Sequence, residues 1–413
     1  MPAARLQRVT IQEGLPFPQD AAQAGMQESR ALAAKHSRRN NFRTWDPPRE
    51  TMGRTPREWQ IQSGLRQHVP DDLAPFVEWF NNQPEARERF RWALRDSLDE
   101  LLDGSRTGRW AYQHLTKTEK TYLGTAVEVN LTKEFDIDNG ADLDWSIAGL
   151  DIDCKFSKDL GGWEIPMEMY LCAAHGERSG RADHVAVLTW MNDDTSQWAA
   201  GIVRITDERL RWKQERDAHG NRVRAYNRDN KRKLDYGAKS EVHWLWGGLQ
   251  TDLPTNLLLH LKRETRKRIL TAKLPGRASS GQQRVNQLFR EVPDRLIGRQ
   301  TVLTVAQQDD SPKRARDARI QLRRLGIVVL GHQGSHPHIA RALELPVPIK
   351  GEWISTRLVP VCSDDARPKF SLDGQFWARA REDELHLEPV PAPDLPDKRE
   401  IDDQSRSGVD FTS

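Results

Sequence analysis

Hydrophobic residues recur with two different periods in residues 67–218. In the stretch 84–102, Phe90, Leu94, Leu98 and Leu101 fall on one stripe at helical spacing, and residues 71–81 are amphipathic as well. Continuous apolar runs at 184–191 and 199–206 are typical of strands at the centre of a covered sheet. Together these patterns predict an α/β fold in which helices flank a mixed sheet.

The stretch 125–157 joins a helix to a hairpin. Val127, Leu131 and Phe135 stand at four-residue spacing, which predicts a helix that also carries Glu128. A turn at 148–149 then separates two short strand patterns, at 142–147 and 150–157. In the second strand, four apolar residues alternate with four polar ones: Leu150, Ile152, Cys154 and Phe156 with Asp151, Asp153, Lys155 and Ser157.

This alternation decides which side chains can act together. Successive side chains of a strand point to opposite faces, so Asp153 and Lys155 share one face and Cys154 lies on the apolar face. A nucleophilic role for Cys154 is therefore not expected.

A second region, residues 239–362, has a different order of elements. Helices are predicted at 254–270, 282–292, 299–307 and 312–325, followed by strands at 327–330 and 353–359 with a polar loop between them. The fourth helix has Ser311 as its N-cap, Pro312 at its first position and Gly326 just past its end. The last three of these helices, followed by a strand, a loop and a strand, give the order of a winged helix-turn-helix.

The charge of the chain is uneven, although its formal net charge is only +3. Residues 204–277 hold 19 Lys and Arg against 9 Asp and Glu, whereas residues 364–413 hold 7 against 13. A basic body with an acidic end indicates a polyanionic partner, with ordinary solvated charged faces as the alternative. Three cysteines form no disulfide framework, no apolar run could span a membrane, and the N-terminus lacks a signal pattern, so we expect a cytoplasmic protein.

Four charged residues suggest chemistry: Glu128, Asp144, Asp153 and Lys155. Phosphodiester hydrolysis needs a hard cation held by oxygen ligands and a positive charge near the reacting phosphate. Two carboxylates on adjacent strands can share such an ion, and a lysine one alternation along faces the same space. The alternative is an exposed strand face with cross-strand charge pairs. The second acidic-x-Lys triplet, Asp229 to Lys231, lies in a polar segment and is interpreted as a decoy.

The runs LTKTEKTYLGTAVEVNL (115–131) and DWSIAGLDIDCKFS (144–157) resemble the NaeI-type restriction endonucleases. These are type IIE enzymes of the PD-(D/E)xK nuclease superfamily. The resemblance continues through SGQQRVNQLFREV (280–292), TVAQQDD (304–310) and LELPVP (343–348), and covers about residues 70–362. The usual proline before the first aspartate of the motif is replaced by Leu143.

By this resemblance, Glu128, Asp144, Asp153 and Lys155 are the catalytic residues, and Glu128, Asp144 and Asp153 are the Mg²⁺ ligands. The resemblance implies an endonuclease domain (67–218) and a helix-turn-helix domain (239–362). Composition predicts the remaining segments, which are a disordered leader (1–66), a basic linker (219–238) and a flexible acidic tail (363–413). The helix-turn-helix domain is expected to bind a second, effector copy of the DNA site. The resemblance further implies a homodimer that cuts a short palindrome in double-stranded DNA, in a bacterial cytoplasm with a cognate DNA methyltransferase.

The basic residues of the fourth helix are the predicted DNA contacts: Lys313, Arg314, Arg316, Arg319 and Arg323. Gln282, Gln283 and Arg284 suit either DNA contact or helix capping. Three histidines in the polar loop, His332, His336 and His338, are interpreted as DNA-facing or solvated residues rather than a zinc site.

Two other functions stay open from the sequence. The same fold could nick, repair or cut modified DNA, or it could be a DNA-binding regulator with an inert nuclease site. The presence of all four charged residues argues against the inert regulator.

Overall fold

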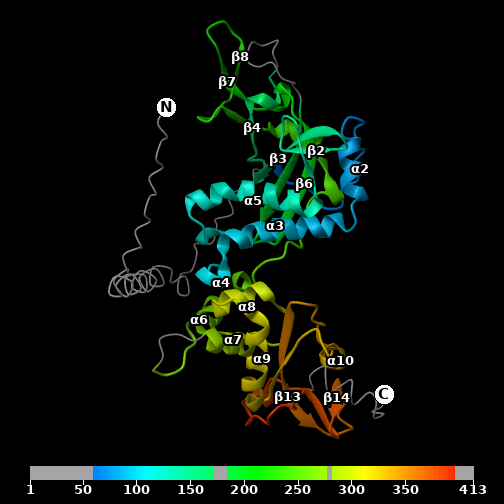
Figure 1. Cartoon of the computed structure of the whole chain (residues 1–413), viewed down its shortest axis with the longest axis vertical. Coiled ribbons are helices and arrows are strands. Elements are labelled where there is room, and N and C mark those ends of the chain that lie inside the picture. The colour runs from blue at the N-terminus through cyan, green and yellow to red at the C-terminus, as the bar shows by residue number, and fades with distance from the viewer. Residues whose placement is uncertain (1–58, 172–183, 277–280, 396–413) are drawn as a thin grey trace, which may run out of the picture. The chain divides into compact units, whose positions relative to one another are not determined.

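The computed structural model describes residues 59–171, 184–276 and 281–395 (Figure 1). Its first part is built on a six-stranded mixed sheet with the order β1-β2-β3-β5-β6-β10. The strands are β1 (Asp138–Asn139), β2 (Trp145–Ile147), β3 (Leu150–Ser157), β5 (Val185–Asn192), β6 (Gln197–Arg204) and β10 (His243–Trp244). Strands β3 and β5 are parallel, and the other neighbours are antiparallel. The predicted mixed sheet is therefore present.

Both faces of this sheet are covered. One face packs against α2 (Ala74–Asn82), α3 (Ala86–Leu102) and α5 (Lys117–Phe135) (Figure 1). Along β5, Val185 and Val187 join this helix-side core, while Ala186 and Leu188 join a second core on the opposite face. The continuous apolar run of β5 thus serves two cores by simple alternation.

The second face is covered by segments that the sequence assigned to a leader and a linker. Trp59, within the predicted leader, is fully buried and its ring meets that of Trp163 edge to face at 5.4 Å. The predicted linker contains β8 (Arg222–Arg224) and β9 (Lys231–Lys233), which pair with β7 (Trp212–Arg216) and β4 (Glu164–Pro166). Because β10 also belongs to the large sheet, the predicted domain end at residue 218 is too early. The rest of the predicted leader, residues 1–58, lies outside the described residues.

The second part starts with a cluster of four helices, which we call the C-terminal helix cluster. Its members are α6 (Arg263–Thr271), α7 (Gly281–Glu291), α8 (Arg299–Ala306) and α9 (Ser311–Leu322). Gln307 ends α8 in a left-handed conformation, with φ of 51°, and Asp310 caps α9 by accepting from the Lys313 N–H at 3.1 Å. The N-cap of α9 is therefore Asp310 rather than the predicted Ser311. The predicted helix 254–270 is broken: α6 begins only at Arg263, after a short 3₁₀ turn.

A five-stranded antiparallel sheet follows the helices. It comprises β11 (Ile297–Gly298), β12 (Ile327–Leu330), β13 (Glu352–Val361), β14 (Lys369–Leu372) and β15 (Gln375–Arg379). Helix α10 (His336–Ala342) replaces part of the predicted polar loop and packs Ile339 against Leu330 and Ile354. Residues 369–379 add a hairpin whose Trp377 is buried, so this stretch is not the flexible tail that the sequence predicted. Residues 396–413 of that tail lie outside the described residues.

None of the described helices is long and apolar enough to cross a membrane.

Candidate active site

Helix α5 positions Glu128. The helix starts at a reciprocal cap, in which Thr116 Oγ1 accepts from the Glu119 N–H and the Glu119 carboxylate accepts from the Thr116 N–H at 2.7 Å. Val127, next to Glu128, is fully buried in the helix-side core, which fixes the rotation of α5. Glu128 itself is half-buried, and burial followed by repulsion from Asp144 raises its pKa. Glu128 therefore lies within electrostatic reach of the first aspartate of the motif.

The β2–β3 hairpin positions the two aspartates. Its turn residues Ala148 and Gly149 both have positive φ, 54° and 73°, as a tight two-residue hairpin turn requires. Asp144 precedes β2, and its Oδ2 atom accepts the Cys154 N–H from β3 at 2.9 Å. This bond fixes the Asp144 carboxylate beside the backbone of Asp153.

Two contacts that sequence reasoning missed hold this arrangement together. The Asp151 carboxylate accepts from the N–H groups of Ala141 and Asp142, at 3.1 and 2.7 Å, and so closes the loop before Asp144. The Trp145 indole N–H donates to Thr132 Oγ1 at 2.7 Å, one turn after Glu128 on α5. The sequence did show Asp151 on the polar face of its strand, and that position could have suggested the first contact. No sequence pattern predicted the second.

Lys155 lies between the two aspartates. Its Nζ is 3.7 Å from Asp144 Oδ2 and forms a closer ion pair with Asp153 Oδ2. Asp153 is only 5% exposed, and burial, together with repulsion from Asp144, outweighs Lys155 and raises its pKa to about 7. Burial alone would lower the pKa of Lys155, but the carboxylates raise it above its ordinary value. The lysine is therefore a permanent cation that partly neutralises the two neighbouring carboxylates.

Burial itself does not alternate along β3, since Asp153 and Cys154 are both 5% exposed, but the contacts of the side chains follow the predicted alternation. Ile152 and Cys154 belong to the helix-side core, whereas Asp153 and Lys155 point to the opposite side of the strand. Burial raises the pKa of the Cys154 thiol well above its ordinary value, so the sulfur stays protonated and unreactive.

The predicted metal ligands are close together but do not form a closed ligand set. Within the described residues, no three His, Cys, Asp or Glu side chains are arranged so that they could enclose a metal ion. The positive charge between the carboxylates of Asp144 and Asp153 is that of the Lys155 ammonium group. The chemistry of the donors nevertheless suits a hard cation, since all three are carboxylates and the buried Asp153 Oδ2 accepts no hydrogen bond beyond its ion pair.

The other polar candidates are placed as follows. The Asp229–Lys231 triplet lies in an exposed turn, where Asn230 has a φ of 55°. His336 is buried and its Nδ1 accepts the Gly331 N–H at 3.1 Å, while His332 and His338 are exposed, so the three do not converge. Arg284 is buried and donates to the carbonyls of Val305 and Ala306 at 2.6 and 2.7 Å, which decides for the capping role.

The five predicted DNA contacts, four on α9 and Arg323 just past its end, separate into two groups. Arg314, Arg319 and Arg323 donate to Gln282, to the Val329 carbonyl and to the Ala392 carbonyl, at 3.3, 2.9 and 2.8 Å. Lys313 and Arg316 are exposed, and neither side chain makes a hydrogen bond or ion pair with another described residue.

A mixed α/β fold that brings an aspartate pair and a lysine together on a central hairpin defines a restriction-endonuclease-like protein. The chain matches the family model for restriction endonuclease NaeI over residues 77–388. It is 41% identical over 296 residues to the type II restriction enzyme NaeI of Lentzea aerocolonigenes, across 71% of this chain and 85% of that enzyme. The chain therefore belongs to the NaeI family of type II restriction endonucleases, which confirms the resemblance seen in the sequence. Enzymes of this class cut double-stranded DNA at specific sites and generally use divalent metal ions.

Proposed function

We propose that this enzyme makes Mg²⁺-dependent double-strand cuts at a short palindromic DNA site, with Glu128, Asp144, Asp153 and Lys155 as its catalytic residues. The observation that carries the proposal is the convergence of Lys155 on the buried Asp153 and on Asp144. Glu128 supports the proposal because it is partly buried and its pKa responds to the charges of both Asp144 and Lys155.

Each residue has a role that follows from its surroundings. Asp144 and Asp153 would hold the cation, and Glu128 would complete or orient its shell. A bound divalent ion would stabilise charge on the phosphate and favour hydroxide over water. Lys155, a permanent cation, would position the attacking water and stabilise the negative charge that grows on the phosphate oxygens. The water-poor position of Asp153, at 5% exposure, strengthens these electrostatic interactions.

The test compares plasmid cleavage by the wild type, Asp153→Asn and Lys155→Met in the presence of Mg²⁺. Discrete linear fragments from the wild type, and a loss of at least about 10³-fold in single-turnover rate for each variant, are expected. Asp229→Asn is the matched control because it changes the same residue type in the other acidic-x-Lys triplet, on an exposed turn. Cleavage by Asp153→Asn at the control rate would refute the site. Conversion of supercoiled plasmid to open circles only would favour a nicking enzyme.

We infer that the C-terminal helix cluster binds a second copy of the DNA site as a helix-turn-helix, with α9 as the recognition helix. The support is geometric and electrostatic. Helices α8 and α9 pack together across the short turn at 307–310, and β12 follows α9 and pairs with β13, which comes after α10. Lys313 and Arg316 lie near the N-terminal end of α9, where a recognition helix contacts base edges. Both line an open cavity that is also lined by Arg299 and Lys350.

Binding of an effector copy can be tested apart from cleavage. A Lys313→Ala, Arg316→Ala double variant is expected to cut at the wild-type rate when saturated with a long substrate, yet to lose stimulation by a short added duplex that carries the site. Arg323→Ala is the control because that arginine caps a carbonyl of the same part of the fold. Unchanged stimulation in the double variant would contradict the role of α9. A homodimer and a cognate methyltransferase, both proposed with this function, can be checked by sedimentation and in the neighbouring genes.

A further inference from the structure

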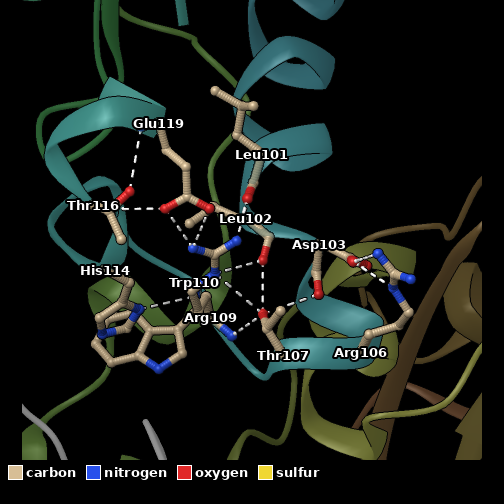
Figure 2. A network of polar contacts seen from close by, with 10 residues as sticks. All are labelled: Leu101, Leu102, Asp103, Arg106, Thr107, Arg109, Trp110, His114, Thr116 and Glu119. Atoms are coloured by element: carbon tan, nitrogen blue, oxygen red, sulfur yellow. Dashed lines mark hydrogen bonds and ion pairs between the residues drawn. The ribbon is translucent and has the colours of Figure 1, made fainter. Parts of the chain in front are cut away.

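Arg109 joins the ends of two helices. The C-terminal end of α3 and the N-terminal end of α5 lie next to each other, because these helices are antiparallel neighbours linked by residues 103–116. The Arg109 side chain, 10% exposed, is directed into this junction (Figure 2). It donates from Nε to the Leu102 carbonyl at 2.9 Å, and from Nη2 to the Leu101 carbonyl. These are carbonyls of the last turn of α3, which find no N–H donor within the helix.

The third branch of the guanidinium reaches the start of α5. Nη1 of Arg109 lies 2.8 and 2.9 Å from the two oxygens of Glu119. Glu119 is the residue whose carboxylate also accepts the Thr116 N–H in the cap of α5. Burial opposes the charge on Glu119, but its hydrogen bonds to Thr116 and Arg109 outweigh burial and hold its pKa below the ordinary value. One arginine therefore binds the last turn of α3 and the first turn of α5 at the same time.

The next residue is directed elsewhere. Trp110 is 1% exposed and belongs to the core of the C-terminal helix cluster, together with Ile269 and Val285. Its ring lies under the Arg266 guanidinium at 4.5 Å and meets His114 edge to face at 4.7 Å. Arg109 is thus bound at the junction of α3 and α5, while its neighbour Trp110 is buried in the core of the C-terminal helix cluster.

We propose that Arg109 is a positioning residue for catalysis, which fixes α5 and thereby Glu128. Glu128 lies nine residues beyond Glu119 on the same helix, or about 14 Å at the rise of an α-helix. A rigid helix transmits a displacement of its first turn to Glu128, and an error of about 1 Å at a catalytic group can cost 10²-fold in rate. This inference rests on the proposed function, since it takes Glu128 to be part of the nuclease site.

The test is a double-mutant cycle between Arg109→Met and Glu128→Gln, measured in single-turnover plasmid cleavage. If Arg109 acts through Glu128, Arg109→Met lowers the rate about tenfold in the wild-type enzyme and less than about twofold in the Glu128→Gln enzyme. Arg106→Met is the matched control: it removes an arginine from the adjacent turn whose side chain is 79% exposed and pairs only locally, with Asp103. An equal loss in both backgrounds would show a merely structural role and overturn the proposal.

A second readout needs no turnover. Binding of Mn²⁺ to the metal-free protein, followed by the electron paramagnetic resonance of free Mn²⁺, should weaken about tenfold in Arg109→Met and remain unchanged in Arg106→Met. Arg109→Lys, which keeps the charge but loses the planar fork, should fall between the two. All measurements are made below the melting temperature of each variant. Wild-type Mn²⁺ binding by folded Arg109→Met would also overturn the proposal.

The two hypotheses fail in different ways. If Glu128→Gln leaves both cleavage and Mn²⁺ binding unchanged, the assignment of Glu128 to the active site is wrong. If Glu128→Gln weakens both but the cycle is additive, the active site stands and the positioning role of Arg109 is wrong.

Discussion

Replacing Asp153 by asparagine should stabilise the metal-free protein while abolishing its activity. The pKa of Asp153 is raised from its ordinary 3.8 to about 7, so the folded state binds this proton more tightly than the unfolded state. The contribution of the protonated Asp153 carboxyl to the free energy of unfolding is fully present below pH 3.8, and it is lost as the pH rises to about 7. A difference of about three pH units corresponds to about 4 kcal/mol, which is an upper limit for the ionised carboxylate at pH 8. Asparagine resembles the protonated acid and escapes this cost.

The assay is urea unfolding in EDTA between pH 4.5 and pH 8.5, with Asp229→Asn as the exposed control. Asp153→Asn should exceed the wild type by only about 1 kcal/mol near pH 4.5 and by a few kcal/mol at pH 8. A difference of the same size at every pH, or a less stable variant at pH 8, would refute the reasoning. Chelation matters here because a bound cation would favour the ionised carboxylate and reverse the sign.

Three further outcomes are expected. Burial and nearby arginines lower the pKa of His114 and His336 to about 3. The free energy of unfolding should therefore fall, as the pH is lowered from 6.5 to 3, by up to about 1.4 kcal/mol per pH unit for each histidine. His336→Asn, which keeps an acceptor for the Gly331 N–H, should reduce that slope in acid unfolding followed by circular dichroism. Gly161→Ala should cost about 2–4 kcal/mol because the new Cβ would lie 2.3 Å from the Trp59 ring, whereas Gly220→Ala, at nearly the same positive φ in open space, should cost only about 1 kcal/mol in chemical unfolding. Iodoacetamide should alkylate the exposed Cys362 and leave the buried Cys154 intact by mass spectrometry, without loss of cleavage; rapid labelling of Cys154 in the folded enzyme would contradict its inert role.

The sequence predicted the local elements of the site well because the short-range physics is strong there. Alternation on β3 separated Asp153 and Lys155 from Cys154, and the structure confirms that separation. The helical stripe of α5 placed Val127 in the core, and the neighbouring Glu128 followed from it. These residues depend on periods of two and 3.6, which are visible in a single sequence.

What the sequence could not predict depends on distant partners. Arg232 stands in a basic, aperiodic stretch, yet it is fully buried because Asp207 and the Leu210 carbonyl accept its hydrogen bonds. Trp59 was assigned to a disordered leader because its cover, Gly161 and Trp163, lies about a hundred residues away. The contacts of Arg109 were missed for another reason: Leu102 and Glu119 lie only 7 and 10 residues away, but the contacts join the ends of two helices and follow no period.

The neutralised arginines of the basic stretch 204–277 change how DNA binding should respond to salt. Arg204, Arg232 and Arg268 are already paired with Asp72, Asp207 and Glu291. Counterions are released only by cations that reach phosphates, so the net charge of this stretch overstates the release. The slope of the logarithm of affinity against the logarithm of salt concentration should therefore follow the exposed residues, such as Lys313 and Arg316. In this enzyme part of the positive charge stabilises the fold, and that part should release no counterions when DNA binds.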